Sequence, residues 1–329
     1  MDLTTRWLGL ELKNPLVPSA SPFTRSLDAA RRLEDAGAAA LVMYSLFEEA
    51  VRTEEESMVR FLHHQDTGFG EADSFLPDHI DFPGELDRYL EQVATLKSTL
   101  GIPVVASLNG VTPGGWLQHA REIQEAGADA LELNVYYVAA DPDQPGTAVE
   151  QRYLGLLADL AAEISIPINL KLSPQFSSVA HFVRTLEAKG AAGVALFNRF
   201  YQPDINVHSL RLQPALHPST SPDALLAMRW IAILHGRVGL SLGATGGIHT
   251  AEDAIKLLLA GATVVHLCTA LLQRGPEHLR TVLAGITAWM DEQGLSSIDE
   301  VRGRLSQAAV SDPAYLLSTV REITVRCVR

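Results

Sequence analysis

One pattern occurs four times along this chain and limits the folds that it can adopt. The copies are E-D-A-G-A-A-A-L-V-M (34–43), E-A-G-A-D-A-L-E-L-N (125–134), E-A-K-G-A-A-G-V-A-L (187–196) and L-L-A-G-A-T-V-V-H-L (258–267). In each copy the end of an amphipathic helix meets a glycine, which suits the left-handed position that ends a helix. The apolar run that follows is typical of a strand buried on both faces of a parallel sheet. Each copy therefore predicts a helix that leads into a parallel strand.

Further apolar runs bring the predicted strands to eight. They lie at 16–20, 103–109, 167–173 and 239–245, and the predicted helices lie at 26–35, 85–100, 115–126, 148–164, 178–189, 223–235, 251–260 and 276–293. Complete alternation of strands and helices at this length is typical of a closed barrel rather than an open sheet. We therefore expect fold class α/β, with a single (β/α)8 TIM barrel as one domain over residues 1–329.

Two kinds of segment lie outside this alternation. Residues 1–15 alternate like a β-hairpin, which we expect to plug one end of the barrel. Three connections that follow strands are long, namely 46–84, 137–147 and 200–222. In a TIM barrel the loops after the strands carry the active site, and loops above about 15 residues usually serve as lids or binding walls. We expect these loops to cover the C-terminal face of the barrel.

Composition and charge narrow the classes of partner. The formal net charge is −13 and the basic residues are scattered, so we expect neither nucleic acid nor membrane as a partner. The two cysteines, Cys268 and Cys327, provide neither a disulfide framework nor a Cys-x-x-Cys motif. The sequence has no signal-peptide pattern and no apolar run of about 18 residues. We expect a cytoplasmic protein that acts on a small molecule.

Polar residues gather at the expected C-terminal ends of the strands. They include Ser19, Ser21, Tyr44, Ser45, Ser107, Asn109, Asn134, Tyr136, Tyr137, Lys171, Ser173, Asn198, Arg199 and Thr269. This set is rich in amides and hydroxyls and poor in carboxylates, which disfavours a two-carboxylate hydrolase and a metal site built on Asp and Glu. His63, His64, His249 and His266 lack a metal-ligand spacing, so we expect solvated or capping histidines and no metal.

Lys171 stands between Leu170 and Leu172 in a predicted strand. Burying an ammonium without a partner costs several kcal/mol, so an anionic or strongly accepting group should meet it. The alternative is a lysine whose head group extends to the rim of the barrel.

The segment A-T-G-G-I-H-T (244–250) joins a predicted strand to a predicted helix. Paired glycines let backbone N–H groups approach a phosphate, and the loops after strands seven and eight are the usual phosphate site of a TIM barrel. A tight turn uses the same residues, so Gly246 and Gly247 alone are a weak signal. Together with C-T-A-L-L (268–272) and Lys171 they predict a cofactor anchored through a phosphate.

Six motifs together resemble those of one family. They are N-P-L-V-P-S-A-S (14–21), L-E-L-N (131–134), L-K-L-S-P (170–174), L-F-N-R (196–199), A-T-G-G-I (244–248) and C-T-A-L-L-Q-R-G-P (268–276), and the last two are the most specific. Over nearly its whole length the chain resembles the dihydroorotate dehydrogenase family of FMN-dependent barrels. The resemblance implies FMN as cofactor, bound by Ala20, Ser21, Ser45, Asn109, Asn134, Lys171, Asn198, Gly246, Gly247, Cys268 and Thr269. Lys171 would lie near the flavin N1, where negative charge gathers on reduction.

The positions that the family uses for its substrate differ in this chain. Tyr137 stands where the family has its catalytic Cys or Ser, Tyr44 replaces a Lys and Ala139 replaces an Asn. The loop A-D-S-F-L-P (72–77), with Ala72, replaces one that carries an amide. A phenol needs a neighbouring cation to act as a base near neutrality, because its reference pKa is about 10.

The resemblance implies Tyr137 and Lys171 as catalytic residues, with Tyr44, Asn134, Tyr136 and Asn198 around the substrate. We expect the tyrosines to line a pocket for a substrate other than dihydroorotate, the alternative being that they only pack the top of the barrel.

By resemblance, the expected function is that of an FMN-dependent oxidoreductase of CH–CH donors, with hydride transfer at flavin N5. The resemblance also implies a homodimer, a link to pyrimidine biosynthesis, and an electron-acceptor subunit as a candidate partner. Two alternatives stay open. One is a colourless phosphate-binding lyase or aldolase with Lys171 as Schiff-base nucleophile, and the other is a non-catalytic flavoprotein subunit that relays electrons.

Overall fold

The computed structural model describes residues 1–54, 84–110, 113–199, 202–215, 217–312 and 316. In this part of the chain eight parallel strands form one sheet: β3 (Leu16–Pro18), β4 (Leu41–Phe47), β5 (Val104–Asn109), β6 (Ala130–Asn134), β7 (Ile168–Leu172), β8 (Gly193–Leu196), β11 (Ser241–Thr245) and β12 (Val264–Leu267). Their order is β3-β12-β11-β8-β7-β6-β5-β4. The end strands meet where the Ala39 N–H donates to the Leu16 carbonyl oxygen at 3.0 Å. The sheet thus curls into a nearly closed barrel, and the predicted (β/α)8 fold is confirmed.

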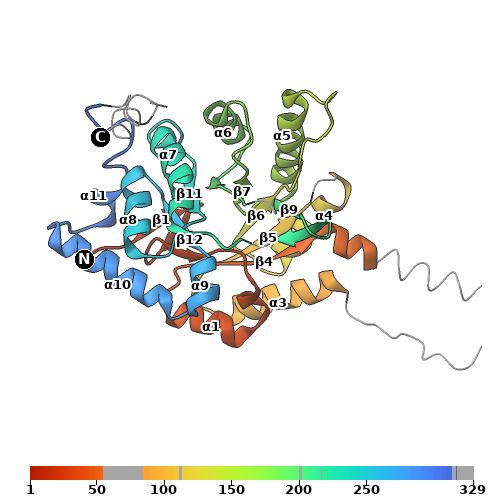
Figure 1. Ribbon diagram of the computed structural model, residues 1–329. Helices are drawn as coiled ribbons and strands as arrows, with labels where there is room; N and C mark the ends of the chain where they lie inside the picture. Colours follow the sequence, from red (N-terminus) through yellow and green to blue (C-terminus); the bar gives the residue numbers. More distant parts are fainter. Residues whose placement is uncertain (55–83, 111–112, 200–201, 216, 313–315, 317–329) are drawn as a thin grey trace, which may run out of the picture.

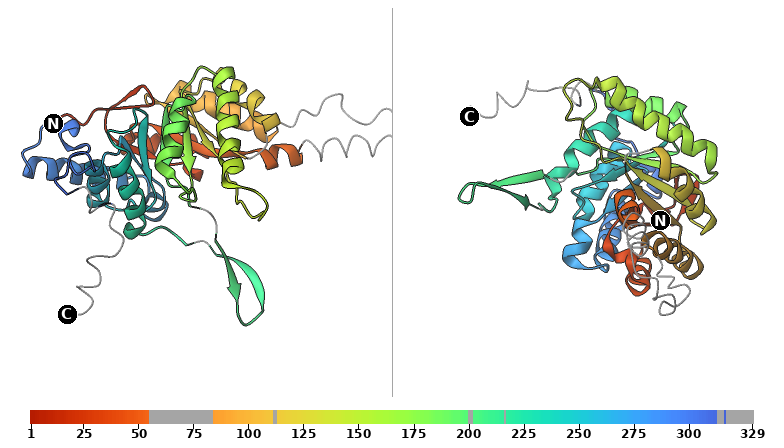
Figure 2. Two further views of the ribbon diagram at one scale, coloured as in Figure 1. Left: turned by 90° about the horizontal axis from the view of Figure 1, so that it is seen from above. Right: turned by 90° about the vertical axis from the view of Figure 1, so that its right-hand side faces the viewer.

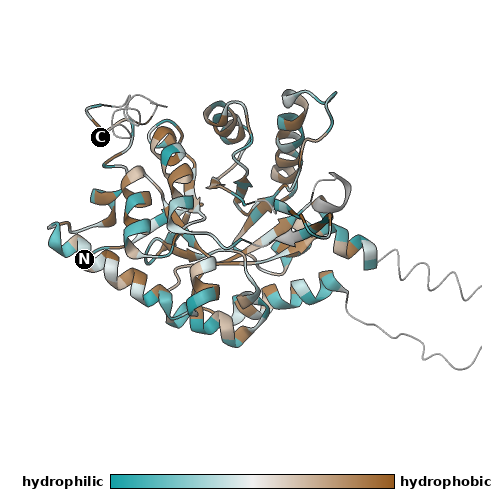
Figure 3. Cartoon of the chain, viewed as in Figure 1, coloured by the Kyte–Doolittle hydropathy of each residue, from teal (hydrophilic) through white to brown (hydrophobic). Residues whose placement is uncertain are grey.

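Helices alternate with the strands and flank the sheet (Figure 1). They are α1 (Leu27–Asp35), α3 (Glu85–Thr99), α4 (Pro113–Glu125), α5 (Gly146–Glu163), α6 (Val179–Ala188), α7 (Ala224–Leu234), α8 (Ala251–Ala260), α9 (Thr269–Arg274), α10 (His278–Glu292) and α11 (Ile298–Val301), with 3-10 helices η1 (Pro22–Arg25) and η2 (Ser221–Asp223). The eight predicted helices are all found, and their ends lie within two residues of the predicted ones. The strands are largely apolar, whereas the helices mix apolar and polar residues (Figure 3), as expected for helices that pack one face on a barrel.

None of the helices in the described part of the chain is both long enough and apolar enough to cross a membrane.

The N-terminal hairpin closes one end of the barrel, as predicted. Its strands β1 (Thr5–Trp7) and β2 (Leu10–Leu12) pair antiparallel. Trp7 is fully buried, and with Leu8 it packs against the first inward-facing residues of the barrel strands, namely Val17, Val42, Val105, Ala130 and Val264. Gly193 leaves room for this contact, because a Cβ there would lie 2.5 Å from Leu8 Cδ2. The hairpin therefore leaves the opposite, C-terminal end of the barrel for a site.

A bulge in β4 changes the direction of one predicted site residue. Val42 pairs with Val105 and Ser45 pairs with Ser107, so β4 has one residue more than β5 between these pairs. Because of the extra residue, Val42 and Ser45 both face the barrel interior. Tyr44, between them, packs into the core that lies between the strands and the helices.

The connection 200–222, predicted as a loop, contains two strands. Strands β9 (Gln202–Asn206) and β10 (Arg211–Ala215) form an antiparallel hairpin, the arm, which projects away from the barrel (Figure 2). The prolines at 203 and 214 explain the failed prediction, because proline is depleted in strands other than edge strands. Of the other two long loops, 137–147 leads into α5, and most of 46–84 lies outside the described residues.

Candidate active site

The interior of the barrel is polar at its C-terminal end. Side chains alternate along a strand, and the last inward-facing residues of β5, β6 and β7 are Asn109, Asn134 and Lys171, which neighbour one another in register. Ser107 Oγ lies 2.9 Å from Ser45 Oγ and accepts a hydrogen bond from Asn134 Nδ2 at 3.1 Å. The structure thus brings predicted cofactor residues from four strands into one polar layer.

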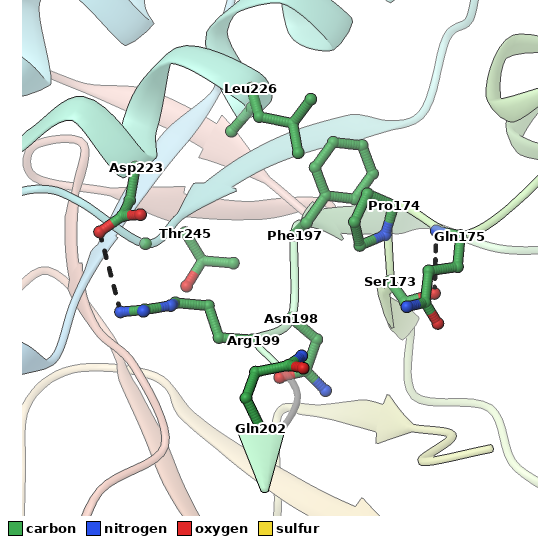
Figure 4. A pocket seen from close by; sticks show the side chains of 12 residues that line it. Ser173, Pro174, Gln175, Phe197, Asn198, Arg199, Gln202, Asp223, Leu226 and Thr245 are labelled. Atoms are coloured by element: carbon green, nitrogen blue, oxygen red, sulfur yellow. Dashed lines mark hydrogen bonds and ion pairs between the residues drawn. The ribbon is translucent and has the colours of Figure 1, made fainter. Parts of the chain in front are cut away.

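A cavity of about 670 Å³ opens at this end of the barrel. Seven of the predicted cofactor residues line it, namely Ala20, Lys171, Asn198, Gly246, Gly247, Cys268 and Thr269. An adjoining cavity of about 280 Å³ shares with it residues that follow β8, one residue of β9, and the end of β11 with the glycine after it (Figure 4). The two cavities form one cleft, whose size suits a cofactor or a small substrate.

Three amide atoms around this cleft are buried and lack a hydrogen-bond partner within the described structure. They are Asn109 Nδ2, Asn134 Oδ1 and Asn198 Nδ2. Leaving such an atom unpaired costs about 1–3 kcal/mol, so native proteins rarely do so without a reason. The three atoms indicate that a polar ligand completes the site. The other four predicted cofactor residues do not line the cavity: Ser45, Asn109 and Asn134 lie in the polar layer, and Ser21 is buried at the start of η1.

Lys171 points into the barrel and has two partners. Its Nζ donates to Ser19 Oγ at 3.3 Å and lies 3.6 Å from Glu132 Oε1. The other oxygen of Glu132 accepts a hydrogen bond from Asn169 Nδ2 at 3.2 Å. The lysine side chain is only 12% exposed, so the rim alternative does not apply. The anionic partner that the sequence argument required exists within the chain, in the strand L-E-L-N.

His266 is a site residue for which the sequence prediction was wrong. Instead of being solvated or capping, it lies on the inner face of β12, is 2% exposed and lines the cavity. Neither ring nitrogen has a hydrogen-bond partner within the described structure. Burial, and then the charge of Lys171, lower the pKa of His266 to about 3, so the ring is neutral near pH 7.

The glycine turn after β11 has the backbone geometry that a phosphate site requires. Gly246 and Gly247 have φ values of 89° and 77°, which other residues rarely adopt. A Cβ on Gly247 would lie 2.4 Å from the Ala224 backbone nitrogen, so the turn packs closely on the start of α7. The Thr250 side chain then caps α8 by accepting a hydrogen bond from the Asp253 N–H at 3.2 Å. Successive N–H groups in such a turn can face an anion.

Several other cavity residues were assigned no cofactor or substrate role from the sequence. Arg199 lies beside the glycine turn and pairs with Asp223 at 3.9 Å. His217 and Ser219 enter the cavity wall from the segment that follows the arm, and Phe47 enters from the end of β4. The place of His217, Ser219 and Phe47 at the cavity could be assigned only once the fold of the arm and of β4 was known.

One of the three predicted tyrosines reaches the cavity. Tyr136 lines it and donates from its hydroxyl to Asn198 Oδ1 at 3.1 Å. Tyr137 turns away, and its hydroxyl donates to Gln144 Oε1 at 2.5 Å. The guanidinium of Arg152 lies 4.1 Å from the centre of the Tyr137 ring, so the cation that the sequence argument required is present, but on the face of the ring.

Tyr44, predicted to contact the substrate, lies outside the cavity because of the bulge. Its ring packs edge-to-face on Tyr89 of α3, with centroids 5.0 Å apart, and the guanidinium of Arg25 lies 4.0 Å from the ring centre. Burial raises the pKa of Tyr44, and Arg25 opposes part of this shift. The structure thus gives Tyr44 the packing role that was the alternative. Ala72, in the loop 72–77, lies outside the described residues.

The cleft fits FMN in three respects. The unpaired amide atoms offer donors and an acceptor to the polar edge of an isoalloxazine, and Lys171 supplies a cation beside them. The glycine turn and the N-terminus of α9 at Thr269 offer backbone N–H groups to a phosphate. Fold and site together therefore define the class of protein as a (β/α)8 barrel with an enzyme-type polar cleft at the C-terminal ends of its strands.

Comparison with known proteins gives the family. The family model for dihydroorotate dehydrogenase matches residues 82–290. A protein of Aeropyrum pernix, named provisionally as dihydroorotate dehydrogenase A (fumarate), is 30% identical over 63% of this chain and 69% of its own length. The dihydroorotate dehydrogenase B (NAD(+)) catalytic subunit of Thermoplasma acidophilum is 26% identical over 92% of this chain and 98% of its own length. The chloroplastic dihydropyrimidine dehydrogenase (NADP(+)) of Arabidopsis thaliana is 22% identical over 93% of this chain and 77% of its own length.

The chain belongs to the dihydroorotate dehydrogenase family. It is therefore an oxidoreductase of the flavoprotein type, within a family that acts on CH–CH donors in general.

Proposed function

We propose that the protein binds FMN in the cleft and uses it to oxidise or reduce a C–C bond of a small molecule by hydride transfer at flavin N5. The observation that carries the proposal is a group of three buried amide atoms, at Asn109, Asn134 and Asn198, that lack a partner within the described structure. They lie beside a cavity that Lys171 and Asn198 line and that ends at a glycine turn. When bound, FMN supplies the hydride chemistry, and the chain supplies binding, orientation and charge. The whole chain serves as a single FMN-binding domain.

Asn109, Asn134 and Asn198 would orient the isoalloxazine, and Lys171 would face its N1 edge. The turn at Gly246 and Gly247, with the backbone at Cys268 and Thr269, would hold the phosphate. Ala20 would shape the wall, Ser45 would act within the polar layer, and Ser21, outside the cavity, would support the wall. Burial raises the pKa of Cys268, with Lys171 acting in the opposite direction, so the thiol stays protonated and contributes through its backbone.

The proton that accompanies hydride transfer needs an acid or base at the cavity. The family position assigns this role to Tyr137, whose hydroxyl is engaged by Gln144. Geometry favours its neighbour Tyr136, because the Tyr136 hydroxyl lies at the cavity beside Asn198. Both phenols are therefore candidates for the acid or base, and Tyr136 is preferred.

Dihydroorotate is not the substrate that the chain suggests. Two residues that the family uses for it are replaced by Tyr44, which packs behind the barrel wall, and Ala139. Each lost hydrogen bond to a buried polar substrate costs about 1–3 kcal/mol. The names of the relatives cover dihydroorotate and dihydropyrimidine, so another cyclic CH–CH donor or acceptor is the class to screen.

The lyase or aldolase alternative is disfavoured by the surroundings of Lys171. A Schiff-base nucleophile must be a neutral amine, whereas Lys171 is paired with the buried carboxylate of Glu132. The electron-relay alternative differs from the proposal only in lacking turnover of a substrate. Anaerobic mixing with dihydroorotate and with a panel of other donors, followed by flavin absorbance, separates these cases. Rapid bleaching by dihydroorotate would overturn our view of the substrate.

A homodimer is part of the proposal, and the arm supports it. Ile205 and Leu212 pair across the ladder, and Val207 and Leu210 lie at the tip. All four are between 61% and 84% exposed. Side chains alternate along a strand, so the other face of the arm carries the polar Asp204, Asn206, Arg211 and Gln213. An apolar face of this kind marks an interaction surface, and a second copy of the chain offers a matching one across a twofold axis. An electron-acceptor subunit remains a second candidate partner, because several relatives are named catalytic subunits.

A further inference from the structure

Glu132 has no role in the chemistry described so far, yet it occupies the centre of the barrel. It is 1% exposed and lies on the inner face of β6, one inward position below Asn134. Asn169 donates to Oε2 at 3.2 Å, whereas Oε1 has no hydrogen-bond partner within the described structure and lies 3.6 Å from Lys171 Nζ. A carboxylate buried in this way is retained only with a cation beside it, because its desolvation cost is high.

Lys171 is therefore already paired with a carboxylate before a ligand binds. The buried carboxylate of Glu132 balances the charge of Lys171, and Lys171 itself lines the cavity. Two other titratable residues beside Lys171, His266 and Cys268, are both neutral near pH 7, because burial lowers the pKa of the imidazole and raises the pKa of the thiol. Before any ligand binds, this part of the barrel thus has a net charge of zero.

We infer that Glu132 sets the reduction potential of the bound flavin through Lys171, by offsetting the lysine charge that would otherwise stabilise the reduced cofactor. The inference rests on the proposed function. Reduction adds negative charge at the N1 edge. With Glu132 present the local charge changes from zero to negative, and without it the charge would change from positive to zero. Glu132 therefore lowers the potential and favours donation of hydride to a substrate, which makes it a positioning residue and not a catalytic one.

The test compares wild type with four variants by equilibrium reduction against indicator dyes. Glu132→Gln keeps the acceptor for Asn169 and removes the charge, so the variant should bind reduced flavin at least tenfold more tightly relative to oxidised flavin than wild type does. For a two-electron couple this corresponds to a rise of about 30 mV. Glu132→Asp keeps the charge and should stay near wild type.

Lys171→Met leaves the Glu132 carboxylate without its cation, so the reduction potential of this variant should fall below that of wild type. The double variant Glu132→Gln, Lys171→Met removes both charges and should lie above Lys171→Met. Because this variant leaves no unpaired charge in the barrel, it keeps the test available if Glu132→Gln does not fold.

A Glu132→Gln potential no higher than that of wild type, or a double variant no higher than Lys171→Met, would overturn the inference. Wild-type protein that binds no flavin would instead refute the proposed function. The two failures are therefore distinguishable.

Discussion

At the scale of single residues, we expect removal of the hydroxyl to have different effects at the two adjacent tyrosines, Tyr136 and Tyr137. Tyr136→Phe should keep flavin bound and lower turnover of the true substrate by about 10²-fold, the usual contribution of general acid–base catalysis. Tyr137→Phe removes a hydroxyl that is engaged by Gln144, so its effect should be several-fold smaller. Single-turnover kinetics at matched flavin occupancy measure both. A large loss in Tyr137→Phe alone would return the role to the residue that the family position indicates.

For Asn109 we expect a substitution to have opposite effects on the stability of the protein and on its affinity for FMN. Its Nδ2 is buried without a partner in the described structure, at a cost of about 1–3 kcal/mol in the flavin-free protein. Asn109→Leu should therefore raise the Tm of the flavin-free protein and weaken FMN binding by about tenfold or more. Asn206→Leu, at the half-buried end of β9 in the arm and outside the cavity lining, is a control that should leave FMN binding unchanged. A variant that loses stability and keeps its FMN affinity would show that Asn109 is structural.

At the scale of elements, the glycine turn after β11 and a helix glycine form a matched pair. Gly247→Ala introduces a Cβ 2.4 Å from the Ala224 nitrogen at a φ of +77°, so it should weaken FMN binding more than riboflavin binding, because the turn holds the phosphate. Gly155 lies inside α5, where an added Cβ would meet no atom within 4 Å, and Gly155→Ala should stabilise the fold by up to about 1 kcal/mol. Flavin titrations and thermal unfolding give both results. Equal losses for FMN and riboflavin would place the phosphate elsewhere.

The arm is the element that tests the dimer. Ile205→Gln with Leu212→Gln should convert a dimer into a monomer, because both apolar side chains lie on one face of the hairpin. The control Asp204→Asn with Arg211→Gln changes the opposite face, keeps its net charge and should leave the molar mass unchanged. Light scattering after size-exclusion chromatography measures the mass. A dimer that survives the apolar change would exclude the arm as its interface.

Elements and site differ in how far the sequence predicts them. The barrel strands and helices follow from the repeated helix–glycine–strand pattern, because burial on both strand faces leaves a strong signal. Asn134 and Lys171 follow from their positions at strand ends. Glu132 does not, since one carboxylate in L-E-L-N reads as part of an apolar strand until the partner strand brings Lys171 to it. Tyr44 likewise depends on a one-residue bulge, which alters the direction of a side chain without a mark in the sequence.

At the scale of the whole molecule, the protein is a barrel closed at one end by apolar side chains and left polar at the other. Trp7 fills the plugged end, and the amide layer with Lys171 faces the open end. Between the two ends lie the buried Glu132, Asn169 and His266, whose polarity is costly for folding unless the site uses it. On the proposed function, the polar end is the part of the barrel that would hold the cofactor.

The central claim is that this cleft binds FMN, and one measurement tests it most directly. Flavin-free protein titrated with FMN should bind one equivalent per chain, acquire the visible absorption of a bound flavin and quench its fluorescence. Lys171→Ala should weaken that binding or lower the reduction potential of the bound flavin, because it removes the cation beside the N1 edge. Protein that is colourless as purified and takes up no FMN in the titration would contradict the account.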